Sequence, residues 1–205
     1  MADKFKNKYR NESHRKPGWD YSSDGHYFIN LVVQHRYQVL GIVENGKMIL
    51  NAWGEIVLNE WNKSFVMRAE LFCDTFIIMP NHLHAIVTID NNAVNNVDLN
   101  KPVGSHGRAT QRILNDKSPK WERKPKSISS FVAGFKSAIN TAIDNEIDNG
   151  GNLFPNLGKF NRNNHFWQPN YHDHIIRNEK SFENISNYII NNPAKWVDEG
   201  FYGNE

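Results

Sequence analysis

The stretch FIIMPNHLHAIVTID, residues 76–90, contains two apolar runs separated by the polar sequence MPNHLH. Both runs have the composition of β-strands, and Pro80-Asn81 is a turn signal, so the sequence predicts an antiparallel hairpin in the middle of a sheet. Side chains at positions i and i+2 of a strand point to the same face. His82 and His84 therefore project together, and the apolar side chains that alternate with them, from Leu83 onward, line the opposite face.

The histidine pair has two interpretations. Two imidazoles side by side on a central strand can chelate one metal ion, and two histidines can also simply occupy a solvated face. The strongly apolar flanking strands favour the first interpretation, because burial makes an unpaired imidazole costly. A metal ion needs more than two protein ligands, or else water and substrate. The pair is thus predicted to be half of a site.

A second half of the site is predicted on the last helix, residues 179–192, which Asn178 can cap and Pro193 stops. Tyr188 and Asn192 are four residues apart, so they stack on one side of this helix, at the edge of its apolar stripe. A tyrosine there can act as a nucleophile, and an asparagine can offer its carbonyl oxygen to a metal. The alternative is structural, with Tyr188 at the boundary of the core and Asn192 closing the helix.

The remaining elements indicate an α+β fold. Strands and hairpins are predicted at 26–34, 37–51 (with the turn Asn45-Gly46), within 65–79, at 83–89 and within 166–178, and amphipathic helices at 52–64 and 127–147. This order predicts a ferredoxin-like antiparallel sheet with helices packed on one face and an added C-terminal helix that carries the tyrosine.

The domain organisation follows from length and charge. The chain has 205 residues, of which 39% are apolar, enough for one domain with a full core. We expect a basic N-terminal arm (1–22), a single domain (23–196) that contains a basic loop (91–126), and a C-terminal tail (197–205). Residues 1–16 carry six Lys and Arg against two acids, and residues 101–126 carry eight against two. Such segments indicate a polyanionic partner, or else simply solvated loops.

Composition also excludes some classes of protein. Cys73 is the single cysteine, so the chain has no internal disulfide and no CxxC site. The sequence contains no apolar run of membrane-spanning length, and its first residues lack the apolar centre of a signal peptide. We therefore expect a cytoplasmic protein without a membrane partner.

Four motifs together carry a family resemblance: FIIMPNHLHAIVTI, SFVAGFKSAIN, WQPNYHDHIIRN and NYIINNPAKW. In this order and at roughly this spacing they resemble the REP-associated (IS200-like) single-tyrosine transposases of the HUH endonuclease superfamily. The resemblance covers about residues 14–196. In that family the position four residues after the tyrosine is often Gln, and here it is Asn192, one methylene shorter, as in the YIxxNP pattern of the REP-associated branch.

The resemblance implies a metal-dependent endonuclease and strand transferase for single-stranded or hairpin DNA. It implies that His82, His84 and Asn192 bind Mg²⁺ or Mn²⁺, and that Tyr188 attacks the scissile phosphate to give a 5′-phosphotyrosine. Ligand hardness alone would favour Zn²⁺ or Mn²⁺ for imidazoles. The resemblance further implies a bacterial, nucleoid-associated protein that acts as a monomer or a homodimer.

Basic and aromatic residues then become candidates for DNA contacts. They are Arg10, Arg15, Lys16, Arg108, Arg112, Lys120, Trp121, Arg123, Lys124 and Lys136. A solvated Lys136 is an equal alternative. Tyr171 is a rival nucleophile, for which we expect a structural or DNA-stacking role, and His174 is a weaker candidate for the metal site.

Two other functions fit the same residues. One is a nucleic-acid-binding protein that keeps the fold without catalysis, and the other is a phosphoesterase that uses a metal-bound water. The second predicts turnover without a covalent adduct and little dependence on Tyr188. The DNA target sequence, and whether the protein mobilises DNA or serves its host, stay open.

Overall fold

The computed structural model describes residues 4–5, 8–9, 15–93, 126–151, 153–161 and 163–196. Its centre is a four-stranded antiparallel sheet with the strand order β6-β7-β3-β8. The strands are β3 (Gly25–Val32), β6 (Leu71–Met79), β7 (His82–Ile89) and β8 (His172–Ile176).

Two helices connect these strands in the ferredoxin-like manner. α1 (Ala52–Val66) precedes β6, and α2 (Ile128–Asp148) precedes β8, so each helix joins two strands that have one other strand between them. A separate hairpin of β4 (Gly41–Glu44) and β5 (Lys47–Leu50) leads into α1. The predicted fold class is confirmed.

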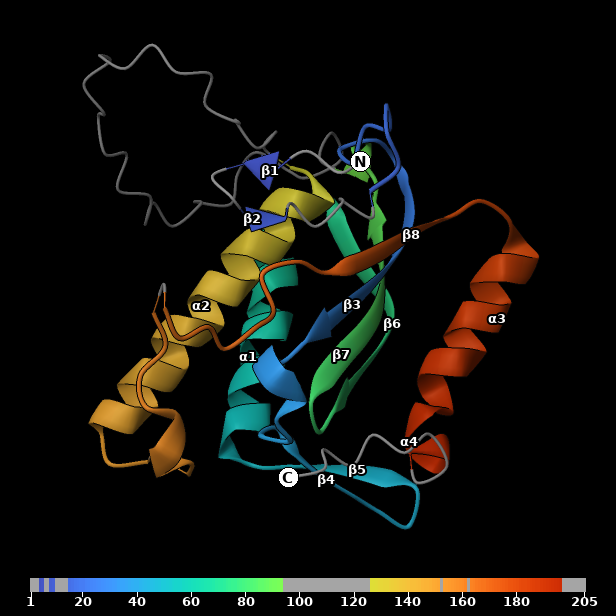
Figure 1. Ribbon diagram of the computed structural model, residues 1–205. Helices are drawn as coiled ribbons and strands as arrows, with labels where there is room; N and C mark the ends of the chain where they lie inside the picture. Colours follow the sequence, from blue (N-terminus) through green and yellow to red (C-terminus); the bar gives the residue numbers. More distant parts are fainter. Residues whose placement is uncertain are drawn as a thin grey trace, which may run out of the picture.

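The larger core lies between the sheet and the pair α1 and α2, which cover one face (Figure 1). α2 follows the predicted apolar spacing, and its residues Phe131, Phe135 and Ile139 are buried. Trp61 of α1 packs between Phe131 and Phe135, with ring centroids 5.6 and 5.2 Å apart. The alternate residues of β7, beginning with Leu83, point into this core, so the predicted apolar face of the strand is confirmed.

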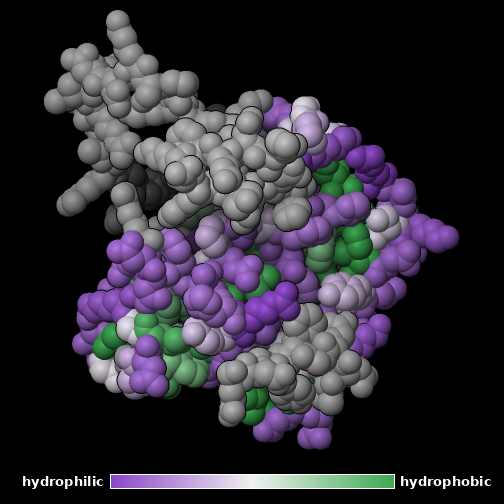
Figure 2. All heavy atoms as spheres, viewed as in Figure 1, coloured by the Kyte–Doolittle hydropathy of each residue, from purple (hydrophilic) through white to green (hydrophobic). Residues whose placement is uncertain are grey.

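The other face of the sheet carries α3 (Glu179–Ile190) (Figure 1). A second, smaller apolar cluster of Ile86, Ile176 and Ile189 lies between them. Phe28 packs against this cluster and is only partly buried. Figure 2 shows hydrophobic atoms at the surface between β8 and α3. This face is therefore thinly covered, which leaves room for polar residues at its end.

Two local predictions are wrong. The β6–β7 hairpin is present, but β6 is the outer strand of the sheet, because β3 pairs with β7 on the side away from β6. The last helix ends at Ile190 rather than Asn192, with the Asn191 N–H donating to the Asn187 carbonyl. Pro193 cannot continue the ladder because it lacks an N–H. It instead lies near the start of a separate short helix, α4 (Asn192–Lys195), where no N–H is needed.

Other local signals act as expected. Asn45 and Gly46 have φ values of 51° and 69°, as a two-residue hairpin turn requires. The Asn178 side chain accepts a hydrogen bond from the Ser181 N–H and caps α3. Short elements complete the description: β1 (Lys4–Phe5), β2 (Lys8–Tyr9), and 3₁₀ turns at Gln34–Arg36 and Pro155–Leu157. Within the described ranges, the helices are too short or too polar to cross a membrane.

Candidate active site

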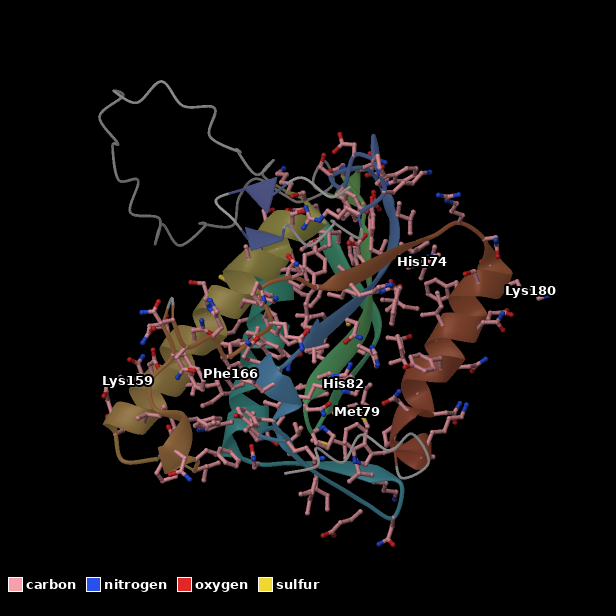
Figure 3. The ribbon with its side chains drawn as sticks, viewed as in Figure 1. Met79, His82, Lys159, Phe166, His174 and Lys180 are labelled. Atoms are coloured by element: carbon pink, nitrogen blue, oxygen red, sulfur yellow. The ribbon has the colours of Figure 1, made fainter. Side chains whose placement is uncertain are left out.

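The two histidines of β7 lie on the face of the sheet that α3 covers. His82 is 7% exposed and His84 is 4% exposed, and their ring centroids are 4.5 Å apart. Figure 3 shows His82 beside Met79 at the end of the β6–β7 hairpin. The prediction that both imidazoles share the face opposite the main core is confirmed, but they are buried rather than solvated.

Asn81, in the turn before the pair, fixes the protonation of His82. Its Nδ2 donates to the carbonyl of Arg36 at 3.2 Å, which leaves its Oδ1 as the atom that contacts His82 Nδ1 at 2.7 Å. An amide oxygen only accepts, so His82 Nδ1 must carry the proton. The lone pair of His82 is therefore on Nε2, where a metal ion can use it.

Tyr188 reaches the pair from α3. Its hydroxyl lies 3.2 Å from His84 Nε2, and the two ring centroids are 5.2 Å apart. The hydroxyl of Ser186 on the same helix hydrogen-bonds to Thr75 of β6 at 2.9 Å, which helps hold α3 on the sheet. Tyr188 is 37% exposed, so a substrate can reach it while one side of its ring remains packed near Phe28.

Asn192 completes the predicted set. Although it belongs to α4 rather than α3, its side chain is 97% buried and hydrogen-bonds to His82. Trp196 lies on the other side, with its ring centroid 5.8 Å from that of His82. The structure thus brings together two pairs of residues, His82 with His84 and Tyr188 with Asn192. The two pairs are more than a hundred residues apart in the sequence.

Arg36 is a site residue that the sequence reasoning missed. It lines a small cavity of about 110 Å³ together with both histidines and Tyr188, and its charge acts on His82. His35 and Arg36 both have left-handed backbones, with φ values of 57° and 58°. Such conformations cost about 1–3 kcal/mol each in non-glycine residues and concentrate at functional sites. The hydrogen bond from Asn81 to the Arg36 carbonyl helps hold this backbone.

Asn30 is the second missed residue. It lies directly opposite His84 on β3, and His172 of β8 lies opposite Asn30, so the three form a row across the sheet. Asn30 Oδ1 and His84 Nδ1 are buried, and neither has a hydrogen-bond partner among the described residues. His172 is therefore the β8 histidine that is aligned with the pair, and the weaker candidate His174 is not. Figure 3 shows His174 well away from His82.

Burial keeps both histidines uncharged. It lowers the pKa of His82 to about 4, with the Arg36 charge adding to the effect and the hydrogen bond to Asn192 opposing it. Burial, with smaller contributions from the neighbouring His82 and His172, lowers the pKa of His84 to about 3. Neutral imidazole is the form that binds metal, so both rings are ready to act as ligands at neutral pH.

These low pKa values predict that acid destabilises the fold. Below about pH 6.5 an unfolded histidine takes up a proton, whereas the native rings stay neutral, so unfolding becomes easier as the pH falls from 6.5 towards 4. At pH 5 the loss is about 2 kcal/mol for each histidine relative to pH 7. Urea unfolding at pH 5 and at pH 7 measures this loss of unfolding free energy. His84→Gln should halve the pH dependence and the exposed His174→Gln should leave it unchanged; equal slopes in both variants would contradict the assignment.

The donor set fits a divalent metal ion that keeps open positions. The described residues contain no group of three or more His, Cys, Asp and Glu side chains that is placed to hold a metal ion. The protein ligands would therefore be the two imidazoles and the carbonyl oxygen of Asn192, with substrate and water completing the shell. A metal ion bound to His84 Nε2 would displace the Tyr188 hydroxyl from that atom.

The other candidates lie elsewhere or outside the description. Arg15 donates to the Tyr171 hydroxyl at 2.8 Å, and Lys136 Nζ donates to the backbone carbonyl of Gln168 at 2.7 Å. Neither residue lines the cavity at the histidines. Lys136 is thus neither a solvated lysine nor part of this site. Most of the loop 91–126 lies outside the described residues, and so do these candidates: Arg10, Arg108, Arg112, Lys120, Trp121, Arg123 and Lys124.

Known proteins resemble this chain in sequence or in fold. No family model matches the chain. An uncharacterized protein of Haemophilus influenzae is 30% identical over 194 residues, which cover 95% of this chain and 94% of that protein. The structure of a REP-associated tyrosine transposase bound to a REP hairpin matches 91% of this chain and 75% of its own, with a TM-score of 0.51 and 18% identity. A candidate transposase of Deinococcus radiodurans matches 86% of this chain and 97% of its own, with a TM-score of 0.39 and 18% identity. The chain therefore belongs to the same family as the uncharacterized Haemophilus influenzae protein and has the fold of a REP-associated tyrosine transposase.

Proposed function

We propose that this protein cleaves and rejoins single-stranded DNA, at hairpins, through a covalent phosphotyrosine intermediate. The observation that carries the proposal is the Tyr188 hydroxyl, 3.2 Å from one of two buried, neutral histidines on a central strand. A tyrosine at a pair of metal-competent imidazoles is a suitable arrangement for nucleophilic attack on a phosphodiester. The fold shared with a transposase bound to a hairpin gives further support.

Tyr188 is the proposed nucleophile. Its phenolic oxygen forms a bond to phosphorus, the bond from phosphorus to the 3′-oxygen breaks, and the phenolic proton ends on the released 3′-hydroxyl. The product is a 5′-phosphotyrosine, and attack by a second 3′-hydroxyl reverses the step and joins two strands. A phenol is a good enough leaving group for this reversal, so the exchange needs no ATP.

His82 and His84 are proposed ligands rather than bases. A group whose pKa is about 3 or 4 is too weakly basic to take a proton from a phenol. When bound, a Mg²⁺ or Mn²⁺ ion would stabilise charge on the phosphate and orient it. Asn81 keeps the His82 ring in the tautomer that presents Nε2, and Asn192 contributes the third protein ligand.

A trapping experiment tests the proposal. The protein is incubated with a DNA hairpin that carries a single-stranded 5′ extension, with Mn²⁺ or with EDTA, and denatured. A covalent protein–DNA adduct is expected with Mn²⁺ and not with EDTA. Mass spectrometry should find the nucleotide on the peptide that contains Tyr188. DNA binding without an adduct, across hairpins of varied sequence and with either metal, would support a non-catalytic binding protein instead. Released product without an adduct would support a phosphoesterase.

Arg36 is proposed to stabilise the charge that develops on the phosphate. The Arg36→Gln variant tests this role, because its expected effects on adduct formation and on Mn²⁺ affinity are opposite in direction. Arg36→Gln should slow adduct formation on the order of 10²-fold, because a preorganised cation is lost. The same change should strengthen Mn²⁺ binding, because a positive charge next to His82 disappears. Calorimetric Mn²⁺ titration and single-turnover kinetics measure the two effects; a parallel loss of both would instead make Arg36 a structural support of the site.

A further inference from the structure

A second cavity, of about 480 Å³, lies between α2 and the segment 165–171. α2 lines it with one polar face in which small residues, Ser129, Ala133 and Ser137, open space along the helix. The volume falls within the range of small-molecule and nucleotide sites. This face of α2 is distinct from the apolar stripe that packs into the core. Because it is polar, it does not need to be covered by another helix.

The cavity is positively charged. Arg15 and Lys136 line it, and the lining contains neither Asp nor Glu. Burial lowers the pKa of Lys136 to about 8, so at neutral pH it still carries its charge. The buried carboxylate of Asp173 acts on Tyr21 and Tyr171, as Arg15 does, so one negative charge is already close to the cavity. Two cations against this one carboxylate leave an excess of positive charge, which favours an anionic ligand.

The lining also provides a stacking surface. Arg15 lies over the ring of Tyr171, with its guanidinium carbon 5.1 Å from the ring centroid, and a planar base can stack on such a guanidinium. A ligand with a phosphate and a flat ring matches this set.

The cavity and the histidine pair lie on opposite faces of the sheet, because α2 covers one face and α3 the other. Their backbones are nevertheless linked. Trp167 forms a bridge with Val33, the Gln168 N–H donates to the Val32 carbonyl at 2.9 Å, and Val32 is paired with His82. Residues 167–168 are therefore two strand spacings, roughly 10 Å, from the backbone of His82. A DNA strand that occupies both sites has to pass around the edge of the sheet.

We propose that this cavity binds one unpaired nucleotide of the same DNA strand that Tyr188 attacks. Lys136 donates to the carbonyls of Gln168 and Asn170 at 2.7 and 3.3 Å, which leaves its third N–H for the phosphate. Arg15 provides the second cation and the stacking surface. The position of this nucleotide relative to cleavage rests on the proposed function, whereas strand binding in the cavity does not.

The test measures strand binding in a Tyr188→Phe background, where no covalent chemistry interferes. The probe is a fluorescein-labelled single-stranded dT8, titrated at several salt concentrations. Arg15→Gln and Lys136→Met should each raise its Kd about tenfold and reduce the slope of log Kd against log salt by about 0.7, the value for one lost phosphate contact on a single strand. Lys63→Met, the same change at an exposed lysine of α1, should alter neither.

A photocrosslink locates the nucleotide. An octamer with one 5-iodo-2′-deoxyuridine should crosslink to the peptide that contains Trp167 and Tyr171, and dTMP or inorganic phosphate at equal concentration should not prevent it. Efficient competition by dTMP would overturn the proposal in favour of a free nucleotide, and a crosslink confined to other peptides would overturn it altogether. A crosslink in a protein that never forms an adduct would remove the proposed function and leave this site standing.

Lys136 also supports the backbone of the segment 165–171, so its loss could act through the fold. Thermal unfolding of each variant separates the two roles. If Lys136→Met is too unstable to assay, Arg15→Gln decides, provided that its thermal unfolding matches that of the parent protein. Weaker binding with an unchanged salt slope in Arg15→Gln would mean that the cavity is structural and would overturn the proposal.

Discussion

Tyr188→Phe is expected to abolish the covalent adduct, with a loss on the order of 10³-fold or more, as for the removal of other enzyme nucleophiles. Phenylalanine keeps the ring that packs near Phe28 and His84, so the fold should lose only the hydroxyl hydrogen bond, worth about 1 kcal/mol. Mn²⁺ affinity should stay the same or rise up to about tenfold, because the hydroxyl no longer competes for His84 Nε2. Adduct trapping and calorimetric titration measure both.

Tyr171→Phe is the matched control for this prediction. The Tyr171 hydroxyl accepts a hydrogen bond from Arg15 and lines the second cavity rather than the first, so its loss should leave the chemical step intact. Burial raises the pKa of Tyr171, which also makes it the poorer nucleophile. An adduct that survives in Tyr188→Phe and disappears in Tyr171→Phe would reverse the assignment of the nucleophile.

The sequence predicts the parts of this site whose geometry is local. His82 and His84 share a face because a strand alternates every two residues, and no tertiary information is needed to see it. The apolar periods of α1 and α2, the Asn45-Gly46 turn and the Asn178 cap are local in the same sense. The order of these elements then limits the sheet to few topologies, of which the ferredoxin-like one is observed.

What the sequence does not reveal depends on register and on backbone conformation. Asn30 faces His84 only because of the pairing of β3 with β7, and His172 joins the row only through the pairing of β3 with β8. A shift of one residue in either register would remove them. Arg36 approaches His82 through two consecutive left-handed residues, and neither His35 nor Arg36 signals that conformation in sequence. The one signal that the sequence offers for these further site residues is Asn81, a polar residue directly before the histidine pair.

The break between α3 and α4 has a similar cause. Proline after a helix indicates a stop but not whether the chain restarts as a new helix, and here it restarts at Asn192. Asn192 belongs to α4 and hydrogen-bonds to His82, and Trp196, which follows α4, has its ring centroid 5.8 Å from that of His82. Tyr188 and Asn192 are therefore found together at the histidines, although the prediction that one continuous helix carries both is wrong.

His84→Ala is expected to remove metal-dependent chemistry altogether. With one imidazole gone, the described residues offer a metal only His82 and the oxygen of Asn192 at this site, and Mn²⁺ affinity should fall by a factor of at least 10², the upper range for loss of a group that merely supports a ligand. Adduct formation should fall at least as far, since the phosphate then loses the charge stabilisation that a metal would supply and keeps only that of Arg36. Mn²⁺ titration by calorimetry, followed by adduct trapping at saturating Mn²⁺, separates lost binding from lost chemistry.

His172→Ala and His174→Ala are the matched controls, because both remove an imidazole from exposed positions of β8. The variant His174→Ala should leave Mn²⁺ affinity unchanged. His172 stands in the row of His84 and Asn30 and helps lower the pKa of His84, so its loss should raise that pKa without weakening Mn²⁺ binding at neutral pH. Because His84 is already neutral there, a loss of affinity in His172→Ala comparable to that in His84→Ala could not come from protonation. It would instead make His172 a ligand and move the metal towards β8, away from Asn192.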